Sequence, residues 1–199
     1  MTSVRSTPAV ETERLVLHRP SRHDLDELFA IESDPRVWTH YPSLRHTDLV
    51  LRSLGQTLSV IDRWLEGWRA HGLDTWTVRL SENSTVIGYG GCSVQGQVWN
   101  LGYRLAPGVQ GRGYVTELAW AALRQARAVE PERPIIARLL DHNVASQRVA
   151  VKLGMALAYR ALDQGNPDPS AVRLIYADRT LSAVQLSDLA RAEAPRAGC

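Results

Sequence analysis

Apolar residues recur at helical spacing in four parts of the chain. The clearest stretch covers residues 48–71, where leucines, Ile61 and Trp68 follow one another at steps of three and four and Gly72 ends the pattern. This spacing predicts a long amphipathic helix. Similar spacing predicts shorter helices over residues 24–32, 113–129 and 143–153.

Extended segments, rich in β-branched and aromatic residues, separate these helices. Three of them follow one another with short polar turns between them, which is typical of an antiparallel meander. The expected strands are 12–19, 75–80, 86–94, 98–105, 135–140, 156–162 and 172–177. This order predicts an α+β domain within the broad α/β class, with a mixed, mostly antiparallel sheet of about seven strands flanked by about four helices.

The predicted elements form one domain. With 199 residues, 44% of them hydrophobic, the chain can bury a core of its own. We place the domain at residues 11–178, with terminal tails at 1–10 and 179–199. The second tail is rich in Ala and Arg, so we expect it to be mobile or loosely docked.

Composition argues against several classes of partner. The formal charge is only +2 and the basic residues are scattered, so no nucleic-acid-binding surface is expected. No run of about twenty apolar residues exists that could cross a bilayer, and the first ten residues do not resemble a signal peptide. Cys92 and Cys199 form neither a disulfide framework nor a metal-ligand spacing, so we expect a cytoplasmic protein without a metal.

The junction between the strand at 98–105 and the following helix carries the strongest chemical signal. It reads Gln110-Gly111-Arg112-Gly113-Tyr114-Val115-Thr116. Glycines here allow a tight turn with inward-pointing N–H groups, and the helix adds the positive end of its dipole, so the segment suits a pyrophosphate. It lacks the lysine of a P-loop and the third glycine of a dinucleotide fingerprint. A glycine turn that merely starts a helix remains the alternative.

Residues 110–115 resemble the Q/R-x-x-G-x-G/A pyrophosphate loop of the GCN5-related N-acetyltransferase (GNAT) family, although Val115 stands where Gly or Ala is usual. We expect this branched side chain to crowd the helix packing more than the phosphate. Residues 143–155 resemble the N-x-x-S-x-x-V-x-x-K-x-G-F/M signature of the RimJ/RimL-type branch, which includes the ribosomal-protein alanine acetyltransferases. With 101–105 and 12–17, which also resemble that branch, the likeness extends over residues 11–177.

The resemblance implies an acyl-CoA acyltransferase fold and an enzyme that transfers acetyl directly from acetyl-CoA to a primary amine, on a protein N-terminus or a small molecule. A homodimer is a further expectation, because dimers are common among relatives. Asn143 would contact the cofactor or simply cap its helix. In the family, the serine at the position of Ser146 is the proposed proton donor to the leaving thiolate. The Ser146 hydroxyl could instead form a hydrogen bond back to the helix backbone. The cofactor-binding residues implied are Leu105, Gln110, Gly111, Arg112, Gly113, Tyr114, Val115, Thr116, Asn143 and Ser146.

The usual acid and base side chains of the family are missing. Many relatives carry a glutamate at the position of Asn100, and others a tyrosine at the position of Ala150. His40 suits the pH range best as a base, so we name it with Ser146 as a catalytic candidate, against the alternative of a solvated loop histidine. The other candidate bases are Glu32, Asp34, Tyr41 and Asp163.

Five aromatic residues are candidates for the acceptor pocket, against the alternative that they belong to the core. They are Trp38, Tyr41, Tyr89, Trp99 and Tyr103. Because the usual glutamate and tyrosine are absent, a second function stays open, namely an acyl-CoA-binding or sensor domain with little or no turnover.

Overall fold

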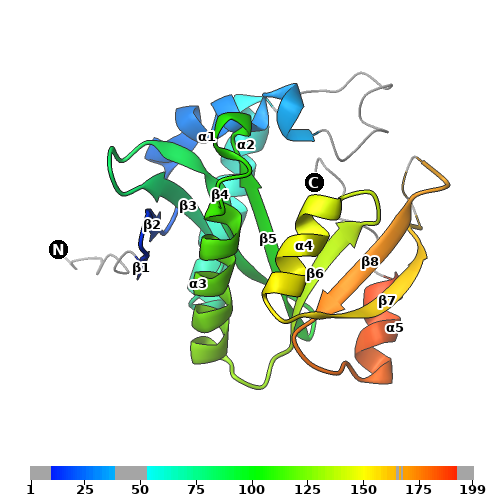
Figure 1. The fold of residues 1–199 in the computed structure, drawn as a ribbon. Helices are drawn as coiled ribbons and strands as arrows, with labels where there is room; N and C mark the ends of the chain where they lie inside the picture. Colours follow the sequence, from blue (N-terminus) through cyan, green and yellow to red (C-terminus); the bar gives the residue numbers. More distant parts are fainter. Residues whose placement is uncertain (1–9, 39–52, 165, 167, 192–199) are drawn as a thin grey trace.

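The computed structural model describes residues 10–38, 53–164, 166 and 168–191, and its strands form one sheet. The spatial order of the strands is β1-β2-β3-β4-β5-β6-β8-β7 (Figure 1). The strands are β1 (Val10–Glu11), β2 (Leu15–His18), β3 (Thr75–Leu80), β4 (Val86–Gln95), β5 (Val98–Leu105), β6 (Ile135–Leu140), β7 (Ala156–Leu162) and β8 (Val172–Ala177). The helices are α1 (Leu25–Glu32), α2 (Leu54–His71), α3 (Tyr114–Val129), α4 (Val144–Lys152) and α5 (Ala183–Arg191).

Neighbouring strands pair antiparallel, except β5 and β6, which are parallel. This parallel pairing covers only Trp99 opposite Ile135 and Asn100 opposite Ile136. Beyond these residues the two strands diverge, as Figure 1 shows. The sheet is therefore split by a wedge that opens toward the C-terminal ends of both strands.

Helices cover both faces of the sheet. On one face α3 buries Leu118, Ala122 and Ala126 completely, in the main core with residues of α4. On the opposite face α1 and α2 pack around Leu28 and Ile61, both fully buried. Each layer follows from the apolar stripe that the sequence places on one side of its helix.

The long helix α2 has clear signals at both ends. Ser53 and Gln56 form a capping box at its start, and Gly72 ends it in the left-handed conformation at φ 70°. The predicted end at residue 71 is confirmed. The predicted start at residue 48 lies outside the described residues.

The mixed, mostly antiparallel sheet is confirmed, but the numbers of elements differ from expectation. The sheet has eight strands instead of about seven, because the stretch expected at 12–19 contributes only β2 and the short β1 precedes it. A fifth helix, α5, lies within the segment expected to be a loose tail. Its Leu189 is only 3% exposed and packs with Ile136 and Ile175 of the sheet. The Ala- and Arg-rich composition concealed this apolar contact.

Replacing Leu189 with Ala tests whether α5 is part of the folded domain. Loss of this buried side chain should lower the free energy of unfolding by about 2–4 kcal/mol. Val184 on the same helix is 60% exposed, so Val184→Ala is the matched control and should change stability by less than about 0.5 kcal/mol. Urea unfolding measures both, and equal effects would mean that the helix is not docked.

Candidate active site

The wedge between β5 and β6 opens into a cleft of about 910 Å³. Residues 101–105 of β5 and 138–140 of β6 form its two sides, and the glycine-rich loop and the start of α4 close one end. Residues of α2, on the opposite face of the sheet, line the other end. The cleft thus extends from the α3 and α4 side of the sheet to the α2 side.

The main chain of β5 points into this cleft. Ala106 donates a hydrogen bond to Ile87 in β4 (2.9 Å), so the pair opposite Ala106 is a hydrogen-bonded one. In an antiparallel ladder the residue before it, Leu105, then directs its N–H and C=O away from β4, and Tyr103 does the same. Because β6 has diverged at this level, these groups face the cleft instead of a strand.

The loop before α3 presents its amides to the same cleft. Gly111 and Gly113 have positive φ values of 78° and 85°, and Gly113 is the residue before the first turn of α3. Within the described part of the chain, no acceptor is bonded to the amides of residues 111–116. The side chain of Gln110 donates to the carbonyl of Leu105 (3.0 Å) and so fixes the loop to the end of β5. Such an arrangement of free amides at a helix start is an anion-binding site.

The side chain of Arg112 does not line the cleft, in contrast to the expectation that it would contact the cofactor. It is exposed, and only its carbonyl has a structural role, as acceptor for Nη1 of Arg14 (3.0 Å). Arg14 also pairs with Glu117 in the first turn of α3 (2.7 Å). Val115 packs partly against the core and also lines the cleft.

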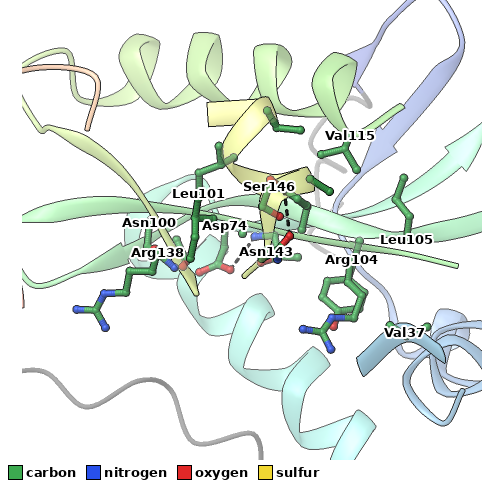
Figure 2. A pocket seen from close by; sticks show the side chains of 18 of the residues that line it. Val37, Asp74, Asn100, Leu101, Arg104, Leu105, Val115, Arg138, Asn143 and Ser146 are labelled. Carbon is green, nitrogen blue, oxygen red and sulfur yellow. Dashed lines mark hydrogen bonds between the residues drawn. The ribbon is translucent and has the colours of Figure 1, made fainter. Parts of the chain in front are cut away.

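The start of α4 brings Asn143 and Ser146 to the cleft. The side chain of Asn143 accepts a hydrogen bond from the amide of Ser146 (3.1 Å), so its capping role is confirmed (Figure 2). The Ser146 hydroxyl lies toward Tyr103 of β5. Burial raises the pKa of Tyr103, and a hydrogen bond between Tyr103 and Ser146 acts in the opposite direction. Two hydroxyl groups therefore meet where α4 faces β5.

The predicted aromatic residues separate into two groups. Tyr89 and Tyr103 line the cleft. Trp99 does not, because it is fully buried in the core, and this part of the prediction is wrong. Trp38 is 7% exposed and does not line the cleft, and its ring stacks under the guanidinium of Arg104 at 3.6 Å. Tyr41 and His40 lie outside the described residues.

The remaining candidate bases are engaged elsewhere. Asp34 pairs with Arg36 at the surface, and this ion pair holds the pKa of Asp34 below its usual value. Glu32 is 1% exposed, accepts a hydrogen bond from Tyr89 and does not line the cleft. Asp163 lines the cleft but is paired with Arg173.

The two positions of the usual acid and base have different surroundings. Asn100 lines the cleft with an amide, and its Oδ1 is buried without a partner among the described residues. Ala150 is 1% exposed and belongs to the core. Within the described ranges no three His, Cys, Asp or Glu side chains gather as metal ligands.

Asp74 is a site residue that the sequence analysis missed. It lies directly before β3, is 6% exposed and lines the α2 end of the cleft (Figure 2). Burial raises its pKa to about 6 despite a hydrogen bond from the amide of Thr75. The only sequence signal is an acidic residue between the helix-ending Gly72 and an apolar strand, and this signal does not reveal burial.

The pKa of Asp74 predicts how its removal changes stability with pH. The folded protein keeps this proton up to about pH 6, whereas the unfolded chain releases it near 3.8, so Asp74 lowers the free energy of unfolding as pH rises between these values. The Asp74→Asn variant has no carboxylate at this position to ionise. Its free energy of unfolding, minus that of wild type, should therefore be roughly 2–3 kcal/mol larger at about pH 8 than at about pH 4. Urea unfolding at both pH values checks this, and a pH-independent difference would contradict it.

Comparison with known proteins places this chain in one family. The acetyltransferase (GNAT) domain model matches residues 14–156. No curated protein matches the sequence. A GNAT-family acetyltransferase structure from Bordetella pertussis is 18% identical, with a TM-score of 0.71, over 87% of this chain and 100% of that one. An acetyltransferase from Agrobacterium tumefaciens is 24% identical, with a TM-score of 0.68, over 90% and 99%.

The RimJ/RimL-type resemblance is also matched by a solved structure. RimL, a ribosomal alpha-N-protein acetyltransferase in complex with coenzyme A, is 15% identical to this chain, with a TM-score of 0.68, over 87% of this chain and 98% of RimL. Identities this low show a common fold. Because the domain model covers most of the chain, from Arg14 to Ala156, the protein belongs to the GNAT acetyltransferase family.

Proposed function

We propose that this protein transfers acetyl from acetyl-CoA directly to a primary amine, on a protein N-terminus or a small molecule, in a ternary complex. The observation that carries the proposal is the set of amides at residues 111–116, which have no acceptor within the described ranges and lie at the same cleft as the N–H groups of Tyr103 and Leu105 in β5. RimL is solved with coenzyme A, and MccE, a microcin C7 self-immunity acetyltransferase of the same fold, with acetyl-CoA and AMP.

The loop and β5 together suit the two chemical parts of coenzyme A. The amides from Gly111 to Thr116 bind the diphosphate at the start of α3, where the helix dipole favours negative charge. The pantetheine arm carries amide groups. Along the edge of β5, Tyr103 offers its N–H and C=O groups to them, and Leu105 offers its N–H. The arm then lies in the wedge like an additional strand, with its thioester near the middle of the sheet.

The chemical step needs little more than correct placement and a proton donor. A β5 amide, at Leu105 or Tyr103, polarises the thioester carbonyl as the amine nitrogen attacks its carbon. The carbon–sulfur bond breaks, and the Ser146 hydroxyl gives its proton to the departing thiolate, with Tyr103 close by to replace it. Holding both reactants in one cleft supplies much of the acceleration.

A second function, binding of acyl-CoA without turnover, is supported by Asn100 and Ala150, which stand where relatives carry acid–base side chains. A screen of acetyl-CoA against small amines and peptides with varied N-terminal residues, read by free-thiol release, separates the two functions. Turnover with any acceptor supports the enzyme. A protein that binds acetyl-CoA in calorimetry but releases no thiol above buffer is a binding domain.

The loop is tested by Gly111→Ala, with Gly108→Ala as the matched control. An alanine at either position has open space, but only Gly111 has a positive φ, so only Gly111→Ala strains the loop. Strain of about 1–2 kcal/mol should weaken acetyl-CoA binding by roughly 5- to 30-fold if the loop must keep its present shape. Calorimetry measures both variants, and equal affinities would argue against the loop as the diphosphate site.

Ser146→Ala tests the proton donor. The helix cap uses only the main-chain amide of Ser146, so α4 should keep its structure and acetyl-CoA affinity should stay within about threefold. Loss of the proton donor should lower kcat by roughly 100-fold. Wild-type kcat in this variant would assign the proton to Tyr103 or to water.

A further inference from the structure

Acetyl transfer to an amine needs a proton acceptor, and His40, the candidate from the sequence, lies outside the described residues. The amine is protonated in water near neutral pH and must become neutral to attack. Asn100, at the usual position of the base, has an amide that cannot take a proton. Asp34 and Asp163 are held by Arg36 and Arg173, respectively. The following inference rests on the proposed function and concerns this proton.

Asp74 is a carboxylate that lines the cleft and has no Lys or Arg ion pair within the described residues. Its Oδ1 accepts the amide hydrogen of Thr75 at 2.6 Å. Its Oδ2 lies against Gly67 of α2, where an added Cβ would come within 1.9 Å of it. Gly67 thus lets the helix approach the carboxylate closely, and the side chain is held from two sides.

The sheet register places this carboxylate across from the reacting part of β5. Thr75 pairs with Gly91 in β4, and Gly91 pairs with Gly102 in β5. Neither glycine adds a side chain to this row, and a Cβ at Gly102 would meet nothing within 4 Å. The cleft therefore continues from Asp74 to β5, with room for an acceptor or for ordered water beside Tyr103.

Titratable groups on three elements lie near Asp74 or line the same cleft. His71 and Arg63 of α2 favour its ionised form, and they oppose the effect of burial, which is larger. Glu66 of α2 and Arg138 of β6 line the same cleft. Cys92 of β4 is buried nearby, and burial strongly raises the pKa of its thiol, so it stays neutral. The resulting pKa of Asp74, about 6, leaves a carboxylate at neutral pH that is more basic than an ordinary aspartate.

We propose that Asp74 is the general base of this enzyme and accepts the proton of the acceptor amine, directly or through one water in the cleft. The nitrogen lone pair then forms the bond to the acetyl carbon as the carbon–sulfur bond breaks. The first nitrogen proton, lost before the attack, passes to the Asp74 carboxylate and from there to solvent. Ser146 gives its proton to the departing thiolate. The second nitrogen proton, released as the amide forms, restores the Ser146 hydroxyl through Tyr103 or water. The cleft thus separates the two proton transfers, with the base at the α2 end and the acid at α4.

The test compares Asp74→Asn with wild type on the best acceptor from the amine and peptide screen, by thiol release across about pH 5–9. The amide should lower kcat by about 100-fold or more and leave acetyl-CoA affinity within about threefold. Wild-type kcat/KM should rise through an ionisation near pH 6, and the variant should lack that ionisation. Asp74→Glu should recover part of the rate.

Asp62→Asn is the matched control, because Asp62 pairs with Arg22 at the surface and does not line the cleft. It should keep wild-type kcat and the wild-type pH profile. Asp74→Asn with kcat within about threefold of wild type, or with the ionisation near pH 6 retained, would overturn the role of Asp74 while leaving the acetyltransferase intact. Absence of thiol release from the wild-type enzyme with every acceptor would instead overturn the proposed function, and the base with it.

Discussion

The short parallel contact between β5 and β6 is the constraint on which the site depends. Two register pairs hold the strands together at one end, and the strands then separate. A strand that loses its partner exposes N–H and C=O groups that must find other acceptors and donors. In this protein the exposed groups of Tyr103 and Leu105 lie in a cleft that also contains the amides of the glycine-rich loop. The main-chain groups that β5 exposes where β6 diverges thereby become part of a binding surface.

Most of the fold could be predicted from local patterns. Apolar spacing and the Gly72 stop located α2, and alternation with polar turns located the meander β3 to β5. Helix α5 could not be found in this way, because its burial depends on one leucine, Leu189, meeting the far side of the sheet. Such a contact is set by tertiary packing, which composition does not reveal.

The candidate site, too, could be predicted from the sequence only where its residues are close together in the chain. The glycine-rich loop and the start of α4 are continuous segments, so their residues could be identified together, and all but the side chain of Arg112 line the cleft. The acceptor end is assembled from separate elements. Trp99 and Asp74 show the difficulty: an aromatic residue at the start of β5 is turned into the core, whereas an aspartate directly before β3 faces the cleft. Only the register of the strands and the close approach at Gly67 determine these outcomes.

The ion pair between Arg14 and Glu117 links the beginning of the chain to the glycine-rich loop. Arg14 lies next to β2 near the edge of the sheet, yet it bonds both to the first turn of α3 and to the carbonyl of Arg112. The edge of the sheet and the loop are therefore mechanically coupled. Whatever displaces the N-terminal edge, such as a fused tag or a pairing partner, will also disturb the loop amides, although it touches neither the cleft nor its ligands.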